Sequence, residues 1–560
     1  MMLPRLLLPA ALFAAPVLFA SPPEEAMKAI TAAEILRHVR VLSSDEFEGR
    51  GPATAGEEKT IAYLTNELKE MGLQPGNPDG TYVQDVPIVS FTPSPEVSFT
   101  VREKQIAMTF PNDYVAYTHQ VKADLSLANT EVVFVGYGII APEFGWDDYK
   151  GVDVRGKTVV MLINDPPVPD ATNPSKLDEK TFGGKAMTYY GRWTYKYEMA
   201  AKQGAAACLI VHETGPAAYP YAVVINSNAR ETFGIASLDG NVGIVPVQGW
   251  LTLDKTIEIF AAAGKDFWSE KKIATTRDFK PVALDAKAGF RIQTVLRNSK
   301  SRNVVALVPG SDPVLKNEYL LYSSHWDHLG RERTKEGDQI YNGAADNASG
   351  TAGMLTLARA FATSPVKPKR SIIFFFPALE EKGLLGSKYY ANNPLYPLEK
   401  TLANLNQDGL NPYGPTNDSR LVGADDSTIV DLLKEKLALQ NRTMSFDAKP
   451  ENGGFYRSDQ FEFAKVGVPA LHGVRGVEYS DKPEGWGLAA GDDYIKNRYH
   501  KVTDEIQPDW TFEGGVTDMQ THLMMGWEIA NGDTWPQWKA TSEFKAARDE
   551  MMAKAAAAKK

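Results

Sequence analysis

Apolar residues recur with helical spacing in the first part of the chain. Thr31 and Glu34 form a capping-box pattern ahead of an apolar run, which predicts that a helix begins there. A second helix is predicted to end at Gly72, because four apolar residues before it share one face: Ile61, Leu64, Leu68 and Met71. The polar, glycine-containing segment 43–51 between these two helices predicts a loop.

A different pattern begins near residue 131. Short apolar runs over residues 132–135, 158–163 and 206–211 predict strands, and residues 197–203 predict a helix between the last two. None of the candidate catalytic residues described below lies between residues 131 and 285. We therefore interpret this stretch as an inserted, smaller α/β module.

From residue 303 onward, nearly continuous apolar runs alternate with helical patterns. Strands are predicted at residues 304–308, 319–323, 371–376 and 402–405, with a helix over about 349–362. Strands without polar alternation are typical of sheets that are covered on both faces. The predicted fold class is therefore α/β, with a mostly parallel mixed sheet flanked by helices.

The two ends of the chain have a composition of their own. Residues 1–20 combine Arg5 with an apolar stretch and small residues before Ser21, which predicts a secretory signal and a secreted or periplasmic protein. A retained N-terminal anchor is the alternative. The Ala- and Lys-rich tail, residues 541–560, is expected to be a solvated helix or disordered. Residues 21–130 and 286–540 then form the main domain, interrupted by the insertion at 131–285.

Composition narrows the possible chemistry. A chain of 560 residues with one cysteine, Cys208, contains no internal disulfide and no cysteine-based zinc cluster. Cys208 lies in an apolar run and is expected to be buried. A net charge of −10 gives no basic stripe for nucleic acid. Any bound metal must therefore use histidine and carboxylate ligands.

Candidate ligands follow the predicted strands. His325 comes just after the strand at 319–323, and Asp327 is suited to accept its second imidazole proton, whereas His328 is a weaker ligand candidate. Asp346 lies in a small-residue segment that runs into a helix, where its two oxygens could reach two metal ions. Each motif also has a simpler interpretation. His325 with Asp327 could be a surface histidine beside an acid, and Asp346 could belong to an ordinary helix start.

Glu380 and Glu381 follow the strand at 371–376. Two adjacent carboxylates near a dry pocket are costly unless a cation compensates them, and one could bind metal while the other acts as general base. A solvated Glu-Glu-Lys turn is the alternative. Asp408 follows another strand, and His500 lies in a polar loop. Together they complete two ligand sets that share Asp346: His325 with Asp408, and Glu381 with His500.

The chain resembles the two-zinc exopeptidases, a family that includes secreted bacterial aminopeptidases, glutamate carboxypeptidase and the transferrin receptor. The resemblance extends from residues 42–50 to Tyr499 and His500. It implies that His325 and Asp408 hold one Zn²⁺, that Glu381 and His500 hold the other, and that Asp346 bridges them. It also implies that Asp327 orients His325 and that Glu380 is the general base. Co²⁺ or Mn²⁺ would also suit such ligands.

The inserted segment resembles a protease-associated domain at residues 135–138 and 202–208. It is expected either to narrow the entrance to the site or to serve as a spacer. The chain departs from the family pattern at Ala345, where an acid is common, and at Gln460, where histidine is common. These departures put contacts around the metals and the substrate in doubt, but they remove no ligand.

The expected activity is that of an aminopeptidase that releases N-terminal residues from short peptides. Arg457 and Arg475 keep a carboxypeptidase possible, because guanidinium groups bind terminal carboxylates. An inactive binding protein on the same scaffold is a third possibility. A serine hydrolase is disfavoured because the chain has no Gly-x-Ser-x-Gly elbow. The expected partner is a peptide substrate, with no nucleic acid and no membrane beyond the export signal, and the oligomeric state is left open.

Overall fold

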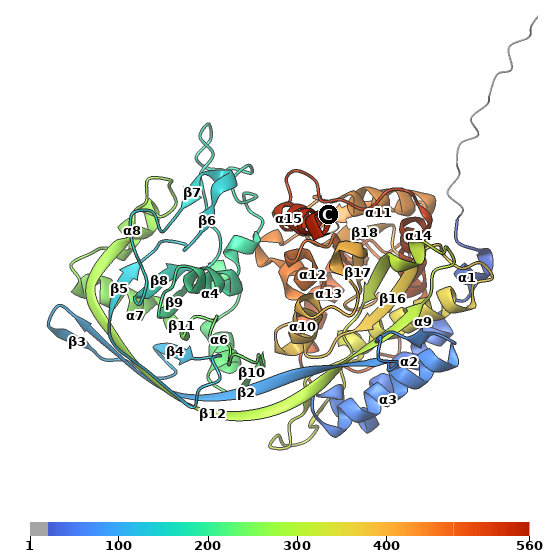
Figure 1. The fold of residues 1–560 in the computed structure, drawn as a ribbon, viewed down its shortest axis with the longest axis horizontal. Helices are drawn as coiled ribbons and strands as arrows, with labels where there is room; N and C mark the ends of the chain where they lie inside the picture. The colour runs from blue at the N-terminus through green and yellow to red at the C-terminus, as the bar shows by residue number, and fades with distance from the viewer. Residues whose placement is uncertain (1–20, 474, 559–560) are drawn as a thin grey trace, which may run out of the picture.

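Two lobes joined by one long ribbon make up the molecule in the computed structural model, which describes residues 21–473 and 475–558 (Figure 1). The ribbon consists of β2 (Val83–Val101) and β12 (Val282–Val308), which pair antiparallel from Val83 with Val304 to Val101 with Ala286. The predicted export segment 1–20 lies outside the described residues. Because β12 belongs to both lobes, a single hydrogen-bonded sheet runs through the whole molecule.

The lobe formed mainly by the second half of the chain holds a mixed sheet in the order β20, β17, β13, β16, β12. Its central strands are parallel to one another, whereas β12 joins β16 antiparallel. This arrangement confirms the predicted fold class. The strand bounds are β13 Tyr319–Ser323, β16 Ser371–Phe376, β17 Thr401–Asn406 and β20 Ala470–His472, with β1 Gln74–Pro75 beside β12.

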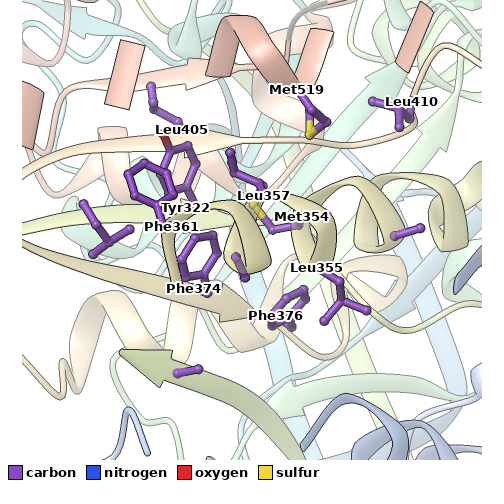
Figure 2. Close-up of a cluster of buried hydrophobic side chains, with 14 of the residues drawn as sticks. Tyr322, Met354, Leu355, Leu357, Phe361, Phe374, Phe376, Leu405, Leu410 and Met519 are labelled. Carbon is purple, nitrogen blue, oxygen red and sulfur yellow. The ribbon is translucent and has the colours of Figure 1, made fainter. Parts of the chain in front are cut away.

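Helix α9 (Gly350–Thr363) packs across this sheet, and almost every side chain in it is buried. Figure 2 shows Leu357 and Phe361 of α9 beside Tyr322 of β13 and Phe374 of β16, and Leu355 beside Phe376. Other helices complete the lobe: α10 Leu385–Asn392, α11 Thr428–Leu439, α12 Gln460–Lys465, α13 Trp486–Asn497, α14 Glu513–Asn531 and α15 Lys545–Ala558. The small pair β18 Asp418–Leu421 and β19 Thr443–Phe446 lies outside the main sheet.

The N-terminal helices join the core of this lobe. Helix α2 (Ala32–Leu42) begins where predicted, because the Thr31 hydroxyl accepts a hydrogen bond from the backbone N–H of Glu34 at 3.3 Å. Helix α3 (Ala55–Glu70) ends two residues before Gly72, and α1 (Glu24–Lys28) precedes both. Between α2 and α3 the predicted loop includes a short 3₁₀ helix, Asp45–Arg50.

The second lobe has its own sheet, in the order β5, β8, β9, β11, β4 beyond β12. Its strands are β4 Tyr114–Tyr117, β5 Asp124–Phe134, β8 Thr158–Leu162, β9 Ala207–His212 and β11 Val247–Thr252. Its helices are α4 Trp193–Lys202, α5 Thr214–Ala217, α6 Tyr221–Asn228, α7 Leu253–Ala262 and α8 Phe267–Ile273. Short strands complete it: β3 Lys104–Ile106, β6 Ile140–Ala141, β7 Trp146–Asp147 and β10 Thr232–Ile235.

The buried cluster of the second lobe draws on side chains from Phe99 to Ile292, and Cys208 is buried within it. This cluster therefore includes strands that precede residue 131. The division of the chain at residues 131 and 285 stays a prediction.

The lobes also touch away from the ribbon. Met187 of the second lobe packs with Tyr456 and Phe461 of the first, and Glu543 accepts a hydrogen bond from the Tyr189 backbone N–H at 2.9 Å. An ion pair between Lys465 and Glu198 adds to this contact. The contact and the ribbon thus fix the lobes at two separate places. None of the helices in the described part of the chain is long and apolar enough to cross a membrane.

Candidate active site

The candidate site lies at the carboxyl ends of the parallel strands in the first lobe. His325 comes two residues after β13, Glu380 four residues after β16, and Asp408 two residues after β17. Parallel strands end on the same edge of the sheet, so these side chains lie close together although they are far apart in the sequence. Asp346 arrives from the loop before α9, and His500 arrives from the loop after α13.

His325 is the centre of one group of side chains. Its Nε2 lies 3.3 Å from Oδ1 of Asp408 and 3.5 Å from Oδ1 of Asp346. One ligand atom from each of His325, Glu380 and Asp408 falls within 4.8 Å of the other two. His325 is buried, with only 1% of its side chain exposed. This spacing suits donors that share one cation.

A second group forms around Glu381. Nε2 of His500 lies 3.1 Å from Oε2 of Glu381 and 3.2 Å from Oδ2 of Asp346. Asp346 therefore turns one oxygen toward each group, which is the arrangement that a bridging carboxylate needs. All five candidate ligands and Glu380 thus converge at one edge of the sheet. Their individual roles stay predictions.

His328 takes a more central place than its sequence suggested. It is fully buried, its Nδ1 lies 2.6 Å from Oε1 of Glu381, and its Nε2 has no hydrogen-bond partner among the described residues. His328 also belongs to a potential ligand group with Asp346 and Glu381. It is therefore available to hold Glu381 in place or to act as a further ligand.

Asp327 is placed differently from the simple expectation. Nδ1 of His325 lies 3.2 Å from the backbone carbonyl of Asp327 but 3.8 Å from its carboxylate. Oδ1 of that carboxylate accepts the backbone N–H of Glu380 at 3.1 Å. Burial raises the pKa of Asp327 to about 7. Asp327 thus connects the loop of His325 to the loop of Glu380, and its orienting role stays a prediction.

Opposite charges in the cluster shift its pKa values strongly. Burial alone lowers the pKa of His500, but Glu381 and Asp346 outweigh it and raise that pKa to about 10. Burial raises the pKa of Asp408, but the charge of His325 outweighs it and leaves that pKa at about 2. For Glu380, burial dominates and raises the pKa well above its usual range. Opposite charges therefore favour the charged forms of His500 and Asp408, whereas burial favours the protonated form of Glu380.

The donor set fits a divalent cation. In the part of the chain that the structure describes, no Lys or Arg forms an ion pair with Asp346, Glu381 or Asp408. Imidazoles and carboxylates without thiolates suit Zn²⁺, Co²⁺ or Mn²⁺. Buried acids without a permanent cationic partner are otherwise costly, so a bound cation would supply the missing charge.

Sequence reasoning assigned no role to two residues that hold the site in place. The Asp504 carboxylate accepts the backbone N–H groups of Ala345 and Asp346, each at 3.1 Å. The side chain of Asn347 accepts the N–H of Gly409 at 2.8 Å and donates to the carbonyl of His325 at 3.2 Å. The sequence gives one hint of these roles: Asp504 lies near His500, and Asn347 directly follows Asp346. The groups to which they hydrogen-bond lie mostly in other segments, so the sequence alone could not assign these roles.

Comparison with known proteins identifies the region that carries this geometry. Residues 303–524 match the family model described as peptidase family M28. The matched region includes all five candidate ligands and Glu380.

Two curated relatives each match part of the chain. Leupeptin-inactivating enzyme 1 of Streptomyces exfoliatus is 31% identical over 238 residues, which are 41% of this chain and 49% of that protein. Leucine aminopeptidase 2 of Trichophyton rubrum is 28% identical, over 39% of this chain and 42% of that protein. The chain thus spans about half the length of these relatives, or less.

Among solved structures, an aminopeptidase from Aneurinibacillus sp. strain AM-1 is 17% identical with a TM-score of 0.48, covering 91% of this chain and 97% of that one. A zinc aminopeptidase from Bacillus subtilis is 15% identical with a TM-score of 0.41, covering 92% and 97%. Both scores are low, and the fold described above comes from this chain alone.

Proposed function

We propose that this protein is an exported, zinc-dependent exopeptidase, and that it acts as an aminopeptidase on short peptides. The observation that carries the proposal is the position of Asp346 between two groups, with Oδ1 facing His325 and Oδ2 facing His500. His325 and Asp408 would hold one ion, and Glu381 and His500 the other. The match of residues 303–524 to the model of peptidase family M28 supports this assignment.

In this proposal the five ligands hold the metal ions, and Glu380 transfers the proton during peptide hydrolysis. A pair of divalent cations held there would lower the pKa of a shared water and stabilise the charge that develops on the peptide carbonyl oxygen. Glu380 belongs to the His325 group and makes no ion pair with Lys or Arg among the described residues. It would take the proton from the attacking water and deliver it to the leaving amine.

The name of one curated relative supports the aminopeptidase direction, since the matching protein of Trichophyton rubrum is called leucine aminopeptidase 2. One observation favours a carboxypeptidase as the second candidate. A Cβ placed on Gly409, next to Asp408, would lie 3.5 Å from Nη1 of Arg475. Arg475 makes no ion pair with any acid of the described chain, so its guanidinium is free to receive a terminal carboxylate.

Blocked peptides test the direction. One short peptide is prepared free, N-acetylated and C-amidated, and each form is incubated with the Zn²⁺-loaded protein while products are identified by mass. An aminopeptidase loses activity only when the amino end is acetylated. Loss of activity only on amidation would instead establish the carboxypeptidase, and no cleavage of any form by protein that binds metal would favour a binding protein.

Metal content tests the centre itself. Protein purified without added metal and then dialysed against Zn²⁺ is expected to carry two equivalents by elemental analysis. A single equivalent at full activity would contradict the paired site.

The second lobe contains residues 131–285, which we propose as a protease-associated insertion, together with strands that precede residue 131. Its contact with the first lobe, through Met187 and Tyr189, supports a role in limiting access to the site. Peptides of increasing length test this role. Cleavage that does not decline with length would leave the lobe as a spacer.

A further inference from the structure

Arg50 ends the short helix between α2 and α3, and its side chain is buried, with 1% exposed. Among the described residues, every hydrogen-bond acceptor of its guanidinium is a backbone carbonyl oxygen. Nε donates to Trp326 at 2.9 Å, Nη1 to Leu42 at 2.7 Å and to Asn342 at 2.6 Å, and Nη2 to Gly343 at 2.8 Å. Among the described residues, no carboxylate forms an ion pair with it.

Apart from Leu42, which ends α2, these acceptors belong to the two loops that carry candidate ligands. Trp326 directly follows His325, and Gly343 lies three residues before Asp346. The backbone carbonyl of Arg50 also accepts the N–H of His328 at 3.3 Å. One residue therefore ties the His325 loop and the Asp346 loop to each other and to the end of α2.

The backbone at this point adopts a conformation that a side chain disfavours. Arg50 has φ +50°, and Gly49 before it has φ +66°. A Cβ on Gly49 would lie 2.5 Å from the carbonyl oxygens of Gly330 and Tyr341, so only glycine fits there. The segment around Gly49 and Arg50 thus packs closely against Gly330 and Tyr341, and the hydrogen bonds of Arg50 hold it there.

Arginine suits this place better than lysine. A planar guanidinium presents donors in several fixed directions, whereas an ammonium group offers a single point. Three donor nitrogens of Arg50 reach carbonyls of three different segments. A lysine could satisfy only part of them.

We infer that Arg50 is a positioning residue, which fixes the His325 loop relative to the Asp346 loop so that both side chains face one cation. This inference rests on the proposed metal centre. It assigns no contact between Arg50 and substrate. Its effect should therefore show in metal binding, before any turnover is measured.

The test compares Arg50→Lys with Arg370→Lys in the full chain. Arg370 is equally buried, with 3% exposed, and its Nη1 donates to the carbonyls of Gly532 and Ile529. It lies directly before β16, at the opposite edge of the sheet from the site. Metal-free protein is titrated with Co²⁺ while its visible absorption is recorded, and thermal unfolding of the metal-free forms is measured alongside.

Arg50→Lys is expected to weaken Co²⁺ binding by about 10- to 100-fold and to alter the absorption band, as loss of groups that orient ligands commonly does. Arg370→Lys is expected to lower the unfolding temperature while leaving affinity and spectrum unchanged. Wild-type affinity and spectrum in Arg50→Lys would overturn the inference. An equal change in Arg370→Lys would overturn it as well, because the effect would then be general destabilisation.

A milder variant covers the case in which Arg50→Lys does not fold. Asp45 is exposed and accepts a hydrogen bond from Nδ2 of Asn342 at 2.8 Å. Asp45→Ala loosens the same segment and is expected to weaken Co²⁺ binding a few-fold, and unchanged binding there would overturn the inference. Wild-type protein that binds no Co²⁺ would instead refute the proposed metal centre, and the inference with it.

Discussion

Both lobes place charged side chains at the carboxyl ends of parallel strands, yet among residues 21–473 and 475–558 the candidate metal-binding groups all lie in the first lobe. Asp408 follows β17 in the first lobe, and Asp165 follows β8 in the second. Asp165 accepts the backbone N–H of Thr188 at 2.7 Å and its hydroxyl at 2.8 Å. Asp408 faces His325, which is itself a candidate ligand. The two aspartates therefore occupy similar places with different partners.

The rest of each strand edge repeats this difference. In the second lobe, Glu213 after β9 pairs with Lys271 at 2.5 Å, and Nε2 of His212 lies 3.0 Å from the carbonyl of Tyr219. In the first lobe, the ion-pair partners of Glu381 among the described residues are two imidazoles, His328 and His500. Polar groups gather at the strand ends of both lobes. A carboxylate there is available to a cation only when a lysine or a backbone group does not already neutralise or bind it.

The largest effect is expected from Glu380→Gln. This change removes the proposed proton acceptor while keeping the shape of the side chain, so turnover should fall by about 10²- to 10⁴-fold. Metal content should remain that of the wild type. Steady-state kinetics and elemental analysis on the same preparation provide the measurement. Wild-type turnover at full metal content would contradict the role of Glu380.

The two aspartates give a matched pair of substitutions. Asp408→Ala should lower the bound metal from two equivalents toward one, because it removes a ligand of the His325 group. Asp165→Ala should keep both equivalents but destabilise the fold by about 1–3 kcal/mol, since the Thr188 N–H loses its acceptor. Elemental analysis and urea unfolding separate the outcomes. If Asp165→Ala also lost metal, the contrast between the lobes would be wrong.

Removing metal should affect the two lobes differently. At a free Zn²⁺ concentration of 100 times the dissociation constant, binding stabilises the folded state by about 2.7 kcal/mol, and a chelator removes that contribution. Amide hydrogen exchange should then accelerate in the loops at 325–328 and 343–347 but not at 163–165. Equal acceleration in both lobes would show that the metal stabilises the molecule as a whole.

The smallest effect concerns pH and the contact between the lobes. Burial raises the pKa of Glu543 from 4.5 to about 8, and its carboxylate accepts hydrogen bonds from Tyr456 and Tyr189. A raised acid pKa means that the folded state favours the protonated form. Stability from this group is therefore complete below the unfolded pKa and is lost as pH rises through about 8.

Glu543→Gln removes this titration. Between pH 5 and pH 9, the free energy of unfolding and the unfolding temperature should both fall by more in the wild type than in the variant. The difference in free energy is at most about 1.4 kcal/mol for each unit of pKa shift. Differential scanning calorimetry at both pH values measures it. Identical pH dependence in the two proteins would exclude Glu543 as the source.

Much of the first lobe could be predicted from short segments. The bounds of β13 and β16 coincide with their apolar runs, and the N-cap at Thr31 is where the capping pattern placed it. These elements depend on local patterns of burial and capping. The ribbon of β2 and β12 was not predicted, because its strands pair residues that are roughly 200 positions apart and β2 contains Pro93 and Pro95 within its pairing.

The sequence by itself determined the kinds of ligand, since one cysteine leaves only histidines and carboxylates, and it placed most of them after strands. Only the tertiary structure decided that Asp346 faces both groups, that His328 lies against Glu381 and that Arg50 joins the loops. The reason is physical: residue type fixes what a side chain can bind. Which partners are within reach depends on backbone atoms that only folding brings together.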